Sequence, residues 1–199
     1  SNSENLGLKI KFAVQEQPKG ICDALLVGQE FIKNDDFTLI LGDNIFYGPG
    51  MTYLMQKSIK NNKQGATIFT YHVYDQSQFG VVKYHNDGKI KEIVEKPSGK
   101  KAGLAVTGLY VFKNDAMNFC KDIPESARGE CEITSLLNVY AKKNLLNEQE
   151  LGRGFVWFDG GSFDTLFEAS NFVKSVQNRH GHKVACLEEI SLKNGWLDR

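Results

Sequence analysis

The order of apolar and polar residues along the chain predicts a series of strands. Residues 8–14 alternate apolar and other side chains with a period of two, the pattern of a strand with one buried face. Residues 37–41 form a short, nearly continuous apolar run, which is typical of a strand buried on both faces. We expect three further strands, over residues 66–73, 104–112 and 155–158.

Helices are expected between these strands. Ile133, Leu136, Leu137 and Tyr140 follow one another at the spacing i, i+3, i+4, i+7, which places them on one face of a helix. The other predicted helices cover residues 21–32, pass through residues 53–59, and begin after a plausible N-cap at Ser162.

The middle of the chain has a different pattern. Residues 80–84 and 89–94 flank an Asn86-Asp87-Gly88 turn, which predicts an antiparallel hairpin. Elsewhere strands alternate with helices, as in βαβ units. We therefore expect an α/β, Rossmann-like fold: a mixed, mostly parallel sheet flanked by helices, with the hairpin as an insertion. No repeat or linker divides the chain, so one domain is expected over residues 1–199.

Composition excludes several classes of protein. The chain has 199 residues, of which 41% are hydrophobic, and its 24 basic side chains balance 24 acidic ones. This balance argues against a nucleic-acid binder that depends on a basic surface. No apolar run approaches the roughly 18 residues that a membrane-spanning helix needs. Four scattered cysteines without a CxxC pair indicate reduced thiols and a cytoplasmic protein.

Two acids follow predicted strands. Asp43 comes after the run 37–41, and Asp159 comes directly after the run 155–158. In open α/β sheets ligands bind beyond the carboxyl ends of strands, and two carboxylates there form an oxygen site suited to Mg²⁺. The ordinary alternative is that each Asp only starts a turn or caps a helix, as Asp does for local hydrogen-bonding reasons.

Three charged residues are candidates for binding a phosphorylated sugar. Glu95 and Lys96 end the hairpin, where the lysine can hold a phosphate and the glutamate a sugar hydroxyl. Arg128 precedes the helix that begins near residue 133, and its guanidinium can clamp an oxyanion. Each also has a plain reading as solvated surface or as part of a helix start.

Other reactive side chains are weaker candidates. His180 and His182 lack a cysteine or aspartate partner nearby, so we interpret them as surface residues. Cys22 lies near Gly20, but no histidine pattern supports a nucleophile there.

Taken together, these segments resemble the glucose-1-phosphate thymidylyltransferases, a branch of the sugar nucleotidyltransferases. The resemblance covers nearly the whole chain and rests on the order and spacing of seven motifs. These motifs are Gln15 to Gly20, Leu41 to Gly48, Phe79 to Val82, Glu95 to Pro97, Val106 to Tyr110, Ser126 to Glu130, and Trp157 to Asp159.

The resemblance implies a reaction and a set of roles. A phosphate oxygen of glucose-1-phosphate attacks the α-phosphorus of dTTP, which gives dTDP-glucose and pyrophosphate. Asp43 and Asp159 are implied to hold Mg²⁺, while Lys96 and Arg128 neutralise and position the sugar phosphate. The implied substrate-binding residues are Gly80, Glu95, Thr107 and Gly108 at the sugar, Gln15 and Gly20 at the thymine, and Trp157. Because the nucleophile is already an anion, alignment and charge neutralisation suffice without a general base.

The sequence departs from the family pattern at three places. Ile21-Cys22-Asp23 replaces a small polar run, and Gly160-Gly161-Ser162 replaces a Gly-Thr pair, so nucleotide preference is less defined than sugar-phosphate handling. The family also begins with a strand and a Gly-rich phosphate loop that are absent before Ser1. We therefore expect a truncated domain of low or no activity, in which another segment or a second copy covers the gap.

Alternatives remain at this point. A relative that uses UTP or another sugar phosphate, and a non-catalytic protein that binds sugar nucleotides, both fit the motifs. A metal-dependent glycosyltransferase fits less well, because Leu41 to Asn44 contains one acid instead of an Asp-x-Asp motif. The resemblance further implies a homo-oligomer, a tetramer in most of the family, with no nucleic-acid or membrane partner.

Overall fold

The computed structural model describes residues 7–197. The described residues form two compact units, one of residues 14–159 and one of residues 7–13 with 160–197. No helix among residues 7–197 combines the length and the apolar character that crossing a bilayer requires.

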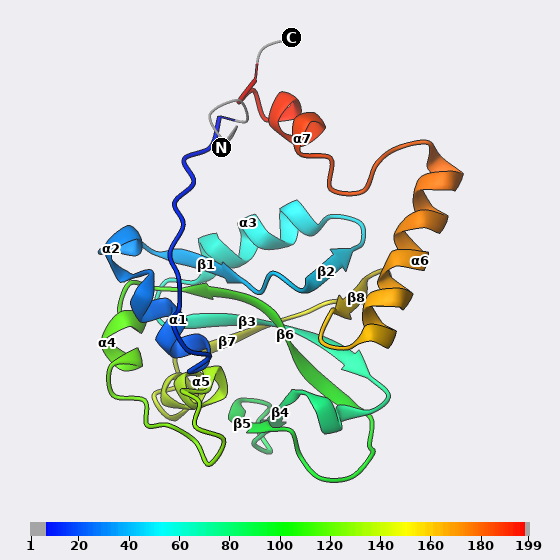
Figure 1. Cartoon of the computed structure of the whole chain (residues 1–199). Coiled ribbons are helices and arrows are strands. Elements are labelled where there is room, and N and C mark those ends of the chain that lie inside the picture. The colour runs from blue at the N-terminus through cyan, green and yellow to red at the C-terminus, as the bar shows by residue number, and fades with distance from the viewer. Residues whose placement is uncertain (1–6, 198–199) are drawn as a thin grey trace. The chain divides into compact units, whose positions relative to one another are not determined.

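The larger unit is built around a mixed sheet in the order β5-β4-β6-β3-β7, with β1 also paired to β6 (Figure 1). The pair β3–β7 is parallel, and the pairs of β6 with β1, β3 and β4 and of β4 with β5 are antiparallel. The strands are β1 (Phe37–Ile40), β3 (Ala66–Val73), β4 (Gly80–Tyr84), β5 (Ile90–Glu95), β6 (Gly103–Phe112) and β7 (Leu146–Glu150).

Helices and a small second sheet cover the two faces of this sheet. One face carries α1 (Ile21–Val27), α4 (Ala116–Cys120) and α5 (Ile133–Lys142), and α2 (Gln29–Ile32) follows α1. The other face carries α3 (Met51–Asn61) and a two-stranded antiparallel sheet of β2 (Asn44–Tyr47) and β8 (Val156–Asp159). Successive residues of β6 serve the two layers in turn: Tyr110 and Phe112 pack under α5, and Leu109 and Val111 pack on the opposite side.

One edge of strand β6 is partly unpaired. On that edge β4 pairs with Ala105, and β1 pairs from Leu109 onward, so the residues between them have no paired strand there. On its other edge β6 bulges against β3, where three residues, 107–109, lie opposite Phe69 alone. The Thr107 hydroxyl donates to the Phe69 carbonyl at 2.9 Å and satisfies it within the bulge. Bulges of this kind are common beside functional sites, since they redirect side chains.

The smaller unit contains α6 (Phe163–His180) and α7 (Leu187–Lys193). The Ser162 hydroxyl accepts from the Thr165 N–H, and the Thr165 hydroxyl accepts from the Ser162 N–H, which forms a capping box. The N-cap predicted at Ser162 is therefore confirmed.

The structure confirms the mixed α/β fold, the hairpin of β4 and β5, and the predicted strands β1, β3, β6 and β8. The helix expected over residues 21–32 is present as α1 and α2, which are separated at Gly28. Among residues 7–197, five elements were not expected, namely β2, β7, α4, α7 and the 3-10 helix η2 (Gln76–Gln78).

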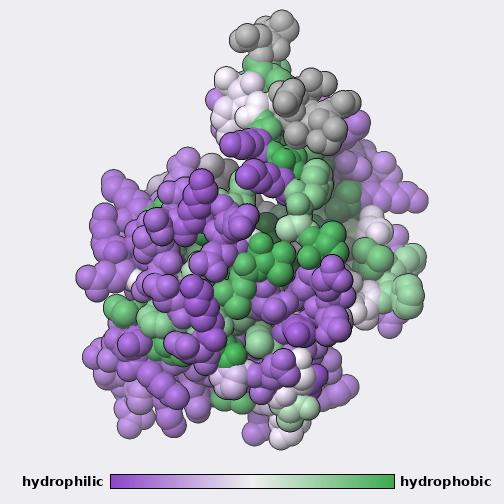
Figure 2. Space-filling view, turned by 60° about the vertical axis from the view of Figure 1, so that its left-hand side comes forward, coloured by the Kyte–Doolittle hydropathy of each residue, from purple (hydrophilic) through white to green (hydrophobic). Residues whose placement is uncertain are grey.

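The strand predicted over residues 8–14 is wrong. Residues 8–14 form no regular element, and Phe12 and Val14 are 81% and 80% exposed. A strand needs a hydrogen-bonded neighbour, and none of the strands among residues 7–197 pairs with this segment. Figure 2 shows that apolar residues reach the surface among hydrophilic ones on the face that it displays.

Candidate active site in the opening beside β6

A pocket of about 180 Å³ lies at the opening between β1 and β4. Its floor is the unpaired stretch of β6, and its walls come from the chain after β1, the start of β4, the end of β5 and the pair β2–β8. Seven of the residues predicted from the sequence to bind substrate or metal line this one pocket: Asp43, Gly80, Glu95, Thr107, Gly108, Trp157 and Asp159.

The two candidate metal ligands meet through the small sheet. Asn44 pairs with Asp159 across β2 and β8, so Asp43 lies one residue beyond the pair. Burial, and to a smaller extent the charge of Asp43, raise the pKa of Asp159. The residues that the structure describes include no group of three or more His, Cys, Asp or Glu side chains placed to share a metal ion. Two carboxylates fit Mg²⁺, which in proteins commonly takes its other ligands from substrate phosphates and water.

Asn44 fixes this corner of the pocket through three hydrogen bonds. Its Oδ1 accepts from the Gly108 N–H at 2.9 Å and from the Trp157 indole N–H at 2.7 Å. Because both partners are donors, Oδ1 must face them, and Nδ2 is left to donate to Asp43 Oδ1 at 2.7 Å. One amide therefore orients the candidate metal ligand and connects it to two walls of the pocket.

Gly108 is a glycine because Asn44 lies against it. A Cβ at position 108 would come within 2.6 Å of the Asn44 amide atoms. The Leu41 N–H also donates to the Gly108 carbonyl at 2.8 Å, so the chain after β1 lies directly on the backbone of β6. A side chain here would separate these segments and widen the pocket.

Aromatic rings form one wall of the pocket. Trp157 lies 5.1 Å from Phe79 and 6.0 Å from Tyr71 between ring centroids. The indole is almost fully buried, and its only polar atom is occupied by Asn44. Phe79 and Trp157 line the pocket and offer it a largely apolar surface, while Tyr71 packs behind them and its hydroxyl donates to the Phe155 carbonyl at 3.2 Å.

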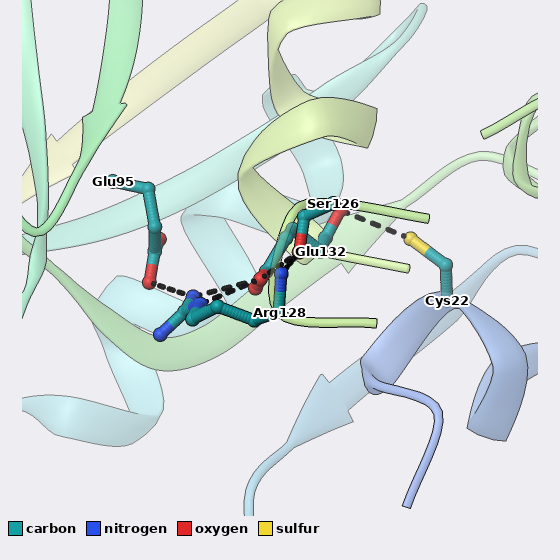
Figure 3. Close-up of polar contacts among 5 residues, drawn as sticks. All are labelled: Cys22, Glu95, Ser126, Arg128 and Glu132. Carbon is teal, nitrogen blue, oxygen red and sulfur yellow. Dashed lines mark hydrogen bonds and ion pairs between the residues drawn. The ribbon is translucent and has the colours of Figure 1, made fainter. Parts of the chain in front are cut away.

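Arg128 is not among the residues that line the pocket, and it is connected to the pocket through Glu95 (Figure 3). Its Nη2 donates to Glu95 Oε1 at 3.0 Å and to Glu132 Oε1 at 2.7 Å, and its Nε donates to Glu132 Oε1 at 3.1 Å. The Ser126 hydroxyl donates to the same Glu132 oxygen at 2.9 Å. These bonds, with Glu132 first, raise the pKa of Arg128, so the guanidinium remains a cation at any physiological pH.

Gln15 and Gly20 lie together just outside this lining. The Gln15 amide donates to the Gly20 carbonyl at 3.1 Å and to Asp23 Oδ2 at 2.6 Å. Gly20 has a φ of +93°, and a Cβ there would be 2.6 Å from the Cys131 carbonyl oxygen. The next residue, Ile21, does line the pocket. Asp23, part of the departure from the family pattern, is thus the residue that holds Gln15.

Lys96, like Gln15, Gly20 and Arg128, lies outside the lining of the pocket. It follows Glu95 with a φ of +42°, its N–H donates to the Phe79 carbonyl at 3.0 Å, and its side chain is exposed.

Cys22 is a packing residue in this structure. It is fully buried, and its thiol donates to the Glu132 carbonyl at 3.4 Å (Figure 3). A hydrogen bond with Cys120 and burial raise the pKa of the Cys22 thiol, which disfavours the reactive thiolate. All four cysteines are free.

Sequence reasoning missed two residues of this site, Asn44 and Glu132. Asn44 directly follows Asp43, but nothing in its neighbourhood in sequence shows that its amide meets Gly108 and Trp157. Glu132 stands four residues after Arg128. That spacing was the available signal, because charged side chains four residues apart frequently pair.

Comparison with known proteins now decides the family. The model of the family described as nucleotidyl transferase matches residues 1–176. The chain belongs to the nucleotidyl transferase family. Its relatives include the glucose-1-phosphate thymidylyltransferase of Neisseria meningitidis serogroup A, 44% identical over 98% of this chain and 68% of the relative. The enzyme of the same name from Mycobacterium tuberculosis H37Rv is 39% identical over 98% of this chain and 67% of the relative.

Matches to solved structures agree with the fold. A Bacillus anthracis protein described as a glucose-1-phosphate thymidylyltransferase, crystallised with sucrose, matches with a TM-score of 0.74 and 35% identity. The match covers 86% of this chain and 68% of that one. A UDP-glucose pyrophosphorylase in complex with UDP-glucose matches with a TM-score of 0.70 and 26% identity, over 81% and 64% of the two chains. The chain therefore spans about two thirds of the length of its relatives.

Proposed function

We propose that this nucleotidyl transferase family member handles a hexose 1-phosphate and a nucleoside triphosphate, with glucose-1-phosphate and dTTP as its substrates. The observation that carries the proposal is the convergence of seven predicted residues on the pocket beside β6. The relatives named glucose-1-phosphate thymidylyltransferase support the choice of these two substrates.

Asp43 and Asp159 are the residues that hold Mg²⁺ in this proposal. The ion supplies positive charge to phosphate oxygens when it is bound. Asn44 directs Asp43 by its hydrogen bond, and the antiparallel pair β2–β8 fixes Asp159 beside it. Burial first, and the negative charge of Asp43 after it, raise the pKa of Asp159, and a bound divalent cation would oppose both effects.

The sugar phosphate lies between Glu95 and Arg128 in this proposal. Gly80, Thr107 and Gly108 leave room for the hexose along the floor, and Trp157 supplies an apolar wall. Arg128 and the exposed Lys96 neutralise the phosphate, whose oxygen then attacks the α-phosphorus. Gln15 and Gly20 take the thymine. Positioning and charge neutralisation carry such transfers.

A UTP-using enzyme is the second candidate, because the UDP-glucose pyrophosphorylase shares the fold. The test is pyrophosphate release by the chain with Mg²⁺ and a matrix of triphosphates against sugar 1-phosphates. Release that requires both dTTP and glucose-1-phosphate supports the proposal, and preferred use of UTP supports the alternative. Binding of dTDP-glucose without release in any combination supports a non-catalytic binder of sugar nucleotides.

The metal assignment has its own test in direct binding of Mn²⁺, measured by electron paramagnetic resonance. Asp43→Asn and Asp159→Asn should each weaken Mn²⁺ binding by at least about tenfold, because each removes one of two charged ligands. On the resemblance alone we also propose that the protein forms a homotetramer. Light scattering on the purified protein tests this assembly.

A further inference from the structure

The Arg128 guanidinium donates to two carboxylates through Nε and Nη2. One oxygen of Glu132 accepts from both Nε and Nη2, which together form one edge of the planar group. Nη2 carries a second hydrogen, which points toward the Nη1 end, and Glu95 Oε1 accepts from Nη2 as well. A phosphate prefers to bind a guanidinium through two parallel N–H bonds. Glu132 therefore occupies the whole Nε–Nη2 edge, and Glu95 occupies the Nη2 half of the Nη1–Nη2 edge. A phosphate can bind both nitrogens of the second edge only if Glu95 leaves Nη2.

The two carboxylates are not equivalent. Glu132 is only 12% exposed and also accepts from Ser126, so it is held in place from two sides. Glu95 is 30% exposed, makes a longer bond to Arg128, and lines the pocket. Its second oxygen, Oε2, lies 3.5 Å from the position of a Cβ on Gly80. Glu95 therefore extends between Arg128 and the space proposed for the sugar, and it is the partner that can be exchanged.

We propose that Glu95 is a specificity-determining residue that occupies Arg128 until a ligand offers hydroxyl donors and a phosphate together. This proposal rests on the proposed function and refines it. Sugar hydroxyls satisfy the Glu95 carboxylate as it leaves Arg128, and the sugar's phosphate takes the Nη1–Nη2 edge that Glu95 vacates. Glu132 keeps its hydrogen bonds to Nε and Nη2 throughout and so holds the guanidinium in position.

This exchange explains how the site rejects phosphates that lack a sugar. Inorganic phosphate, or the phosphate chain of a nucleotide, competes with Glu95 for Arg128 but gives the displaced carboxylate no donor in return. Leaving a charged group without its partner costs free energy, and sites built to bond a hydroxyl discriminate strongly against ligands without one. The discrimination against phosphates without a sugar thus comes from the attraction between Glu95 and Arg128, with which such phosphates must compete.

The first test measures the affinity of the chain for inorganic phosphate and for glucose-1-phosphate by calorimetry, in the parent and in Glu95→Gln. The glutamine competes weakly for Arg128, so phosphate should bind about fivefold tighter, which corresponds to about 1 kcal/mol for one half-exposed ion pair. Glucose-1-phosphate should bind more weakly, because an amide is a poorer acceptor for its hydroxyls. Glu92→Gln removes the same charge from the same strand and should leave both affinities within about twofold.

The second test needs no variant. Methyl α-glucoside, at saturation, supplies the hydroxyls without the phosphate and should tighten the binding of inorganic phosphate to the parent. By reciprocity, phosphate should tighten the binding of the glucoside by the same factor. This measurement remains decisive if Glu95→Gln folds poorly.

The outcomes separate the inference from the proposed function. If the parent binds neither glucose-1-phosphate nor the glucoside, both are overturned. If the parent binds glucose-1-phosphate, but Glu95→Gln shifts both ligands equally or neither, the inference fails and the function stands. Independent binding of the glucoside and phosphate also overturns the inference.

Discussion

Strand β6 and the segment 8–14 are both rich in apolar residues, yet they end in opposite environments. Eight consecutive residues of β6 are buried, and β6 has partners along both edges. Phe12 and Val14 in the segment are about four-fifths exposed, at 81% and 80%. The difference shows that an apolar pattern specifies a strand only when a neighbouring strand accepts its hydrogen bonds. In this chain the candidate site lies where β6 lacks a paired strand on one edge but keeps β3 on the other.

The largest expected effect compares one phenylalanine from each region. Phe112 is fully buried in β6 and packs against Phe37, Tyr110 and Tyr140, with ring centroids at 5.4, 5.9 and 6.1 Å. Phe112→Ala should lower the free energy of unfolding by about 3–5 kcal/mol, because it leaves a cavity. Phe12→Ala should change it by no more than about 0.5 kcal/mol.

Urea denaturation followed by circular dichroism measures both variants. Equal losses would mean that Phe12 is buried in solution, and the contrast between the two regions would then be abandoned.

Much of the fold follows from local patterns, and the site follows only in part. The strand-end position of Asp43 and Asp159 was enough to select both acids, because such positions are where α/β sheets bind ligands. The polar strand β7, with the sequence LNEQE, has no apolar alternation and becomes a strand because β3 offers it a parallel edge. Asn44 and Glu132 act through partners that only the folded chain brings near. Segment 8–14 is the converse, a clear pattern without a partner.

The next effect tests how closely β6 is packed where it meets the pocket. Gly108→Ala places a Cβ 2.6 Å from the Asn44 amide, which three hydrogen bonds prevent from moving aside. Overpacking of this kind costs about 1–3 kcal/mol, and the loss should appear as a lower melting temperature. Gly42→Ala is the control, because a Cβ there meets nothing within 4 Å. If Gly108→Ala and Gly42→Ala have equal melting temperatures, β6 is not closely packed against Asn44 at position 108.

A smaller effect concerns β5, an edge strand whose outer edge is hydrogen-bonded by a side chain instead of by another strand. The outer edge of β5 is covered by Asn138 of α5, whose Oδ1 accepts from the Ile93 N–H at 2.7 Å and whose Nδ2 donates to the Ile93 carbonyl at 2.8 Å. Asn138→Ala should cost about 1–2 kcal/mol for the two bonds. The exposed Asn118→Ala on α4 should be nearly neutral. If the two variants unfold alike, a side-chain partner does not sustain an edge strand here.

The smallest effect is a pH dependence inside the site. Burial and Asp43 raise the pKa of Asp159, so the folded chain binds this proton more tightly than the unfolded chain does. Stability therefore falls as the pH rises from the ordinary aspartate value of about 4 through the raised pKa. Asp159→Asn removes this penalty, so without Mg²⁺ the variant should melt later than the parent at alkaline pH. Below about pH 4 the two should melt together.

Asp87 in the β4–β5 turn provides a control of opposite sign. The Lys89 N–H lowers the pKa of Asp87, so this carboxylate stabilises the fold above its ordinary pKa, and that contribution is lost as the pH falls. Asp87→Asn should therefore melt earlier than the parent at neutral pH, with the gap closing in acid. If both variants instead shift the melting temperature in the same direction across the pH range, removal of any negative charge explains the result. Burial of Asp159 beside Asp43 would then no longer be supported as the cause.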